Sequence, residues 1–308
     1  MSLFDFFKEP DAETQAQRAA ADERQQETIT AIHRKRLPKH IQARLHDSRD
    51  GKSPWIATLT PAELLIVRSH GIRPVAAVSA SCWLHYGFSW TRGHRQGWQT
   101  ALQRLGEEAK AAGANAVLDV KMRTVPIETE NSMDFSLIGT AVKFDGLPPS
   151  ENPLIATVPA LEFVKLLEMG IVPTGIAIGA EYKWLTDWNG STNLFWNGNT
   201  EVTTLSGLFA RVRERALQLL REDAQEQGGS SLAHTHFSQM FEGERNEQKQ
   251  KQYLARYIVI ATVVSQRGAK AIPHDFRMCL DMQSGKTPLT GTSRHHQSYQ
   301  SNEREGAI

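Results

Sequence analysis

The chain has 308 residues and a net charge of +1 from 35 basic and 34 acidic side chains, which suits about two domains and provides no overall field that would attract nucleic acid or an anionic membrane. Two cysteines, Cys82 and Cys279, are too few for a disulfide framework. Because residues 1–7 lack the pattern of a secretory signal and no apolar run approaches the ~18 residues that span a bilayer, we expect a soluble cytoplasmic protein.

The first 52 residues form the first segment of the chain. Residues 8–52 are rich in Gln, Ala, Glu, Arg and Asp and have few large apolar side chains, which favours helix over core. We therefore predict a helical or partly disordered arm over residues 1–52. Its basic cluster, residues 33–36 with Lys39 and His40, is interpreted either as a solvated helix end or as a contact for an acidic partner.

Residues 53–268 contain one sequence unit twice. Residues 56–59 (IATL) return as residues 155–158 (IATV), and residues 71–74 (GIRP) return as residues 170–173 (GIVP), both at an offset of 99. The offset then grows to 115 in the following helix and to 122 in the closing strand, because the second copy carries insertions. The repeat predicts two modules, over residues 53–146 and 154–268.

Each copy is predicted to run as short strand, helix, strand, longer helix and closing hairpin. In the first copy, Thr60 and Glu63 form a capping-box pattern, and Gly71 suits the end of that helix. Apolar side chains in residues 98–112 follow one helical stripe, and residues 116–123 alternate, which predicts a strand with Ala116, Leu118, Val120 and Met122 on the helix side. Residues 145–153 are the expected linker, and 269–308 a mostly disordered tail.

Two short strings carry a family resemblance. Residues 113–117 (GANAV), after a helix rich in Glu and Ala, and residues 139–143 (GTAVK) together resemble the YbjQ family, in the tandem form found in bacterial proteins of unknown function. The resemblance implies an α+β fold of two dodecin-like modules, each with helices on a small antiparallel sheet, and pentameric rings for single-domain relatives. The second copy departs from these strings, with GGSSL at residues 228–232 and ATV at residues 261–263.

His234 and His236 form the sharpest candidate metal site. Residues two apart on a strand share a face, so both imidazoles could meet one divalent transition metal ion. They align with Asp119 and Lys121 of the first copy. The alternative is a pair of surface or interface histidines, since no third ligand is evident.

The remaining candidates have simpler explanations. Cys82 and His85 would face opposite sides of a strand, so a buried structural cysteine is the favoured interpretation there, with His70 and His94 nearby in sequence. Residues 284–287 (SGKT) lack the first glycine of a phosphate-binding loop, and the pair at residues 295–296 (HH) lies in the expected tail. We identify no catalytic residues.

An aromatic insertion stands out in the second copy. Tyr182, Trp184, Trp188, Phe195 and Trp196 lie close together in sequence, bracketed by two Asn-Gly turns. Such a cluster is typical either of an extended hairpin that packs on its own sheet or a neighbouring subunit, or of a site for a ligand.

These features predict a non-enzymatic protein that assembles as a homo-oligomeric ring, within which a metal or small ligand could bind. Two alternatives stay open: an enzyme with a site formed between subunits, and an adaptor that recruits a protein partner through the N-terminal arm.

Overall fold

The computed structural model describes residues 12–52, 57–87, 89–127, 132–187, 201–229, 231–245 and 251–266. The helices are α1 (Ala12–His33), α2 (Lys39–Arg49), α3 (Pro61–Ser69), α4 (Trp90–Ala111), α5 (Ala160–Glu168) and α6 (Thr203–Glu226). The strands are β1 (Ile72–His85), β2 (Ala116–Ile127), β3 (Ser132–Phe144), β4 (Leu154–Ile155), β5 (Ile171–Asp187), β6 (Ser231–Arg245) and β7 (Lys251–Gln266). None of the described helices is long and apolar enough to span a membrane.

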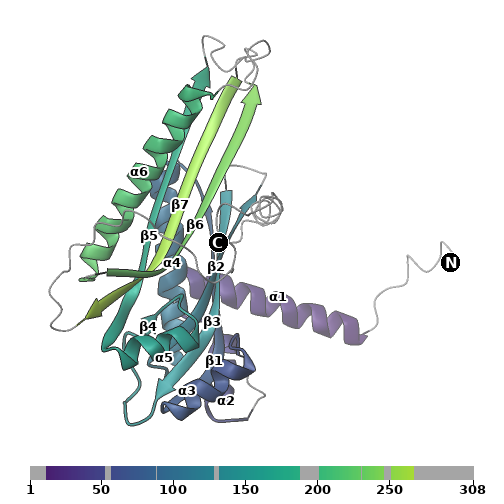
Figure 1. Ribbon diagram of the computed structural model, residues 1–308. Coiled ribbons are helices and arrows are strands. Elements are labelled where there is room, and N and C mark those ends of the chain that lie inside the picture. The colour runs from purple at the N-terminus through teal and green to yellow at the C-terminus, as the bar shows by residue number, and fades with distance from the viewer. Residues whose placement is uncertain are drawn as a thin grey trace, which may run out of the picture.

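Helices and sheets alternate in layers (Figure 1). One sheet has the strand order β1-β3-β2-β4 and the other β5-β7-β6. Helix α4 lies between them, because its buried side chains share one core with the first sheet and with Ile176, Ile178 and Ile258 of the second. Helix α6 covers the opposite face of the second sheet. The fold is therefore α+β, as the sequence indicated.

Two stretches of the chain have the same order of elements. We call α3-β1-α4-β2-β3 the first unit and α5-β5-α6-β6-β7 the second unit. Their antiparallel sheets have equivalent orders, β1-β3-β2 and β5-β7-β6. Register shifts fall at aligned places in the two units. They lie at 74/76 of β1 and 173/175 of β5, and at 118/121 of β2 and 233/236 of β6. Residues aligned in sequence therefore occupy corresponding places in the two sheets.

Local sequence signals account for the helix ends. Thr60 and Glu63 form the expected capping box, with the Glu63 amide donating to Thr60 Oγ1 and the Thr60 amide donating to the Glu63 carboxylate. Helices α3 and α5 are followed by Gly71 and Gly170 at φ +67° and +71°, a conformation that glycine adopts without strain. Helix α5 lacks a side-chain cap because Pro159 stands where α3 has Thr60.

Glycines on α4 bring aromatic rings close to the helix backbone. A Cβ atom at Gly97 would collide with the Phe135 ring, and one at Gly93 would collide with Tyr86. Trp98 and Phe135 are both fully buried, with ring centroids 5.1 Å apart in an edge-to-face arrangement. The close contact between α4 and its sheet therefore depends on small residues at these two positions.

The predicted alternation along β2 is wrong in part. A bulge lies between Leu118 and Lys121, and Asp119 adopts φ +52°. Val117, Val120 and Met122 face the core shared with α4, whereas Ala116 and Leu118 belong to a second core with α3 and α5. The extra residue in the bulge reverses the facing of side chains on its two sides.

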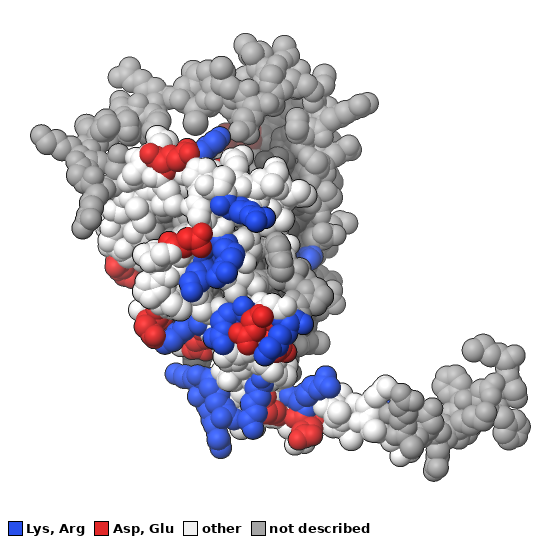
Figure 2. Space-filling view, turned by 90° about the horizontal axis from the view of Figure 1, so that it is seen from below, with Lys and Arg blue, Asp and Glu red and all other residues white. Residues whose placement is uncertain are grey.

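The described part of the arm, residues 12–52, forms the two helices α1 and α2, joined by residues 34–38. Its basic cluster is balanced locally: Glu27 of α1 lies 3.9 Å from Arg36 and 3.8 Å from His40. Acidic and basic side chains also lie side by side over the face seen in Figure 2, so no broad surface of one sign is present there.

Candidate functional site at the junction between the units

The first contact between the units is made along the edge of β2. The amide of Leu154 donates to the Asn115 carbonyl at 3.0 Å, and the amide of Ala156 donates to the Val117 carbonyl at 3.0 Å. Strand β4 thereby extends the first sheet in parallel, although it precedes the second unit in the chain. The short strand that we expected to open the second copy thus joins the sheet of the first.

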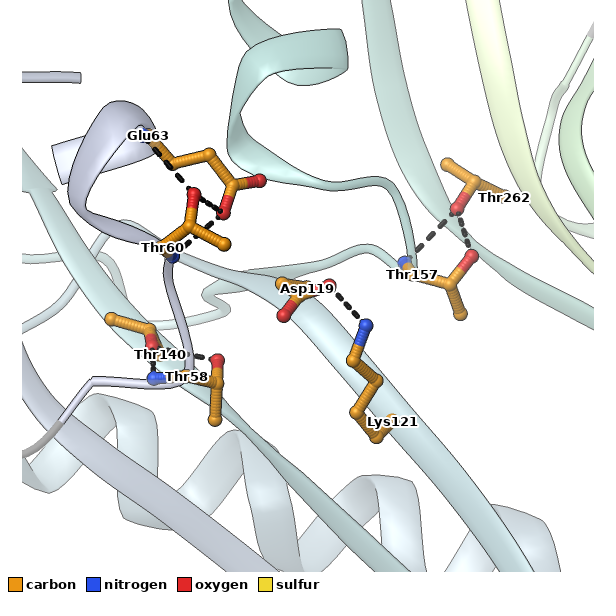
Figure 3. A network of polar contacts seen from close by, with 8 residues as sticks. All are labelled: Thr58, Thr60, Glu63, Asp119, Lys121, Thr140, Thr157 and Thr262. Carbon is orange, nitrogen blue, oxygen red and sulfur yellow. Dashed lines mark hydrogen bonds and ion pairs between the residues drawn. The ribbon is translucent and has the colours of Figure 1, made fainter. Parts of the chain in front are cut away.

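The β2 bulge completes this contact. The amides of Asp119 and Val120 donate outward to the carbonyls of Val158 and Ala156, at 3.1 and 3.2 Å. Asp119 is buried, and its carboxylate accepts from Lys121 Nζ at 2.7 Å (Figure 3). The positive φ therefore turns two backbone donors toward the incoming segment, which explains why the strain of a non-glycine residue is tolerated.

A threonine pair fixes the same segment to its own sheet in both units. The amide of Thr157 donates to Thr262 Oγ1 at 3.0 Å, and the two hydroxyls are 2.8 Å apart. Thr58 makes the corresponding contacts with Thr140, at 2.8 and 2.9 Å, as Figure 3 shows. Residues 57–59 and 156–158 are therefore anchored in the same way to corresponding strands.

A hydrogen bond within each unit caps the edges of β1 and β5 beside the junction. The Ser79 amide donates to the carboxylate of Glu108 at 3.1 Å, and the Ile178 amide donates to that of Asp223 at 2.8 Å. Burial raises the pKa of both carboxyls above their ordinary values, while the hydrogen bond from each amide acts in the opposite direction. An otherwise unpaired edge amide is thus satisfied by a helix side chain in each unit.

The second contact between the units is a buried aromatic and polar network, which sequence analysis missed. His94 of α4 is fully buried; Trp98 Nε1 donates to its Nε2 at 2.8 Å, and its Nδ1 lies 2.9 Å from Tyr182 Oη of β5. Tyr86 Oη lies 3.3 Å from the same Nδ1. Trp90 packs against both tyrosines, with ring centroids 5.1 and 5.8 Å away. The spacing of Trp90, His94 and Trp98 along one helix face was the available sequence signal.

These contacts define the protonation state of His94. Because Nε2 accepts from an indole N–H, the proton must be on Nδ1, which donates toward a tyrosine hydroxyl. Burial holds the pKa of His94 well below its ordinary value, and the nearby positive charge of Arg256 lowers it further. The group that joins the units is therefore a neutral imidazole, without the exposed, charge-poised geometry of a catalytic base.

A groove of about 650 Å³ lies between α4, β4 and the first part of β5. Arg95 reaches across it to Asp223 and Glu226, at 3.4 and 2.9 Å, while Leu102 and Ile176 supply apolar lining. Since its charged groups already pair with one another, the groove is better described as part of the junction than as a separate ligand site.

The predicted metal ligands lie on β6, at the bulge aligned with that of β2. His236 is exposed, and the side chain of His234 lies outside what the structure describes. Among the described side chains, no group of three or more His, Cys, Asp and Glu lies close enough to hold a metal ion. The described donors thus do not complete a metal-ligand set.

The other candidates in the first unit have separate environments. Cys82 is buried, which raises the pKa of its thiol, and His85 on the other face is exposed, as the strand periodicity predicted. His70 pairs with Glu168 at 3.1 Å, linking the ends of α3 and α5. His94 lies in the network described above, so these four residues form no common site.

The aromatic insertion is described only in part. Tyr182 belongs to the network, and Trp184 lies 6.2 Å from Trp90 between ring centroids, so these two pack against the first unit. Its other members, together with the tail motifs, lie outside the described residues: Trp188, Phe195, Trp196, Cys279, residues 284–287 and residues 295–296.

The fold and junction define an α+β architecture, in which two helix-on-sheet units are docked through a strand edge and a helix. Within it, residues 88–145, which include α4, β2 and β3, match the model of the YbjQ family, described as "Putative heavy-metal-binding". The match covers less than half of the chain and lies in the first unit. Comparisons with curated proteins and with solved structures give no match.

Proposed function

We propose that this protein is a non-enzymatic assembly protein made of two YbjQ-like modules, whose chains associate head to tail into a ring. The junction between the two units within one chain is the template for the contact between chains. In that contact, residues 57–59 of one chain enter the β6 bulge of the next, as residues 156–158 enter the β2 bulge.

The observation that carries the proposal is the difference between the two aligned strand edges. β2 and β6 pair with their neighbours in corresponding registers, and both carry the bulge. β2 is covered by β4, whereas β6 forms the edge of its sheet among the described strands. An open strand edge is a ready partner for an added strand.

Exposed apolar side chains on the first unit support the same contact. Leu65 is 73% exposed, yet it aligns with Val164, which is 3% exposed in the core that α5 shares with the first unit. Trp83 is 68% exposed and aligns with Tyr182, which is buried against α4. The first unit thus presents, uncovered, the positions that the second unit uses for docking.

Light scattering across micromolar concentrations tests the proposal with a matched pair of variants. Leu65→Glu should weaken association at least tenfold, because burying a leucine side chain contributes roughly 1.5–3 kcal/mol and a buried charge adds a penalty. Leu147→Glu is the control, since Leu147 is also exposed (52%) but lies after β3, outside these contacts.

A second pair tests the strand edge directly. Thr235→Pro removes the amide that aligns with that of Val120, and should also weaken association, whereas Thr235→Ala retains it. A full-length protein that stays monomeric at all concentrations would refute the proposal.

A further inference from the structure

Helix α2 makes a specific contact with the edge of the first unit. Arg44 donates from one guanidinium nitrogen to the Ala77 carbonyl at 3.2 Å and from another to the Glu108 carboxylate at 3.2 Å. Leu45 is fully buried in the core beside α4, and Ile41 packs against the same core. The arm is therefore docked on the first unit.

The same place on the second unit is taken by α4. There Arg95 pairs with Asp223, which caps the Ile178 amide, just as Arg44 pairs with Glu108, which caps the Ser79 amide. In each case an arginine from a helix earlier in the chain pairs with the acidic side chain that caps the edge strand. Helix α2 thus occupies on the first unit the position that a neighbouring long helix occupies on the second.

The coverage by α2 is incomplete. On β5, helix α4 extends the contact to Tyr182, whose amide donates to Thr91 Oγ1 at 3.3 Å. On β1, the aligned residue is Trp83, which is largely exposed. A groove of about 880 Å³ remains between the arm and the unit, lined in part by Lys35, Arg104 and Ser136.

The surface under the arm also differs in polarity from its counterpart. Ser79, Ser81 and Ser136 stand where the second unit has Ile178, Ala180 and Ile258. The three apolar side chains of the second unit are buried in the core around α4, whereas the three serines of the first unit line the groove beside the arm. A more polar interface with a residual groove is typical of reversible docking, and an apolar one of a permanent contact.

We infer that the edge of β1 is a docking surface for helix α6 of a second copy, and that α2 is a displaceable cap which occupies this surface in the free chain. In head-to-tail association, α6 of one chain would approach the first unit of the next as α4 approaches the second unit. It would then meet α2. The identity of the partner as a second copy rests on the proposed function. The arm would then inhibit association of the chains.

Light scattering of the full chain and of a chain lacking residues 1–52 tests the cap. Removal of the arm should strengthen association at least tenfold. Because the truncation also uncovers the core beside Leu45, Arg44→Glu provides a second test in the full chain: its carboxylate would face Glu108 and release the helix. Arg34→Glu, an exposed position with the same charge change, is the control and should leave association unchanged.

The outcomes separate the cap from the proposed function. If the truncated chain and Arg44→Glu associate more tightly and Trp83→Ala reverses the gain, the cap is supported. If the full chain associates and neither change strengthens it, the proposed function stands and the cap is refuted. If the full chain is monomeric and the truncated one associates, the cap stands and spontaneous assembly of the full chain is refuted. If all remain monomeric and folded, both are refuted.

Discussion

The neutral, buried His94 predicts an acid-sensitive junction. Above the ordinary histidine pKa of about 6.5, the folded and unfolded chains both hold a neutral imidazole, and the stability that it contributes is fully present. As the pH falls below that value, the unfolded chain gains a proton that the folded chain excludes, because burial and Arg256 hold the folded pKa well below the ordinary value. Stability must therefore decrease as the pH falls.

The size of the effect follows from the proton uptake alone. If His94 stays neutral when folded and titrates at about 6.5 when unfolded, lowering the pH from 7 to 5 removes about 2 kcal/mol. Glu108 and Asp223 act with the opposite sign, because burial raises their pKa values and the folded state retains their protons longer. A variant is therefore needed to isolate the histidine.

His94→Gln supplies that comparison, since a glutamine offers both an acceptor for Trp98 and a donor for Tyr182. Urea unfolding of both proteins, at one protein concentration and at several pH values, measures the difference in free energy. We expect wild type to be the more stable at pH 7 and its advantage to shrink by about 2 kcal/mol at pH 5. A constant difference between the two proteins would show that His94 is not excluded from protonation, and would refute the reasoning.

Two further predictions concern the packing of α4 and the metal hypothesis. Gly97→Ala should destabilise the fold by about 1–3 kcal/mol in urea unfolding, because its Cβ meets the Phe135 ring. Gly106→Ala should be neutral or slightly stabilising, because a Cβ there would lie 3.8 Å from Ile155 Cδ1, an ordinary van der Waals contact. If His234 and His236 bind a metal, calorimetric titration with zinc should release or absorb heat that disappears when both are replaced by Ala. Unchanged heat would exclude this site.

The sequence predicted best those features that depend on nearby residues. The capping box at Thr60, the helix ends at Gly71 and Gly170, and the buried stripe of α4 all follow from contacts within a few turns. The bulge at Asp119 could not be predicted in this way, because its strain is offset by the carbonyl of Val158, which is distant in sequence.

The junction was inaccessible for a related reason. His94 looked like one of several scattered histidines, and its partner Tyr182 looked like part of a separate aromatic insertion. Only the docking of the two units brings them together. Alignment of the copies did contain a usable signal. Leu65 and Trp83 of the first copy align with Val164 and Tyr182 of the second, and only the residues of the second copy are buried. Exposure, which distinguishes the copies, depends on tertiary structure.

The covalent connection through residues 145–153 has a consequence for the symmetry of any ring. Each chain contributes its two units together, so a closed ring of whole chains always contains an even number of units. The five-membered ring implied for single modules cannot be formed by these chains without leaving one unit outside it. Symmetry does not require the rotation between two units of one chain to equal the rotation between units of neighbouring chains, since only whole chains are related by it. The rotational symmetry to look for is therefore one that relates whole chains, each of which contributes two units.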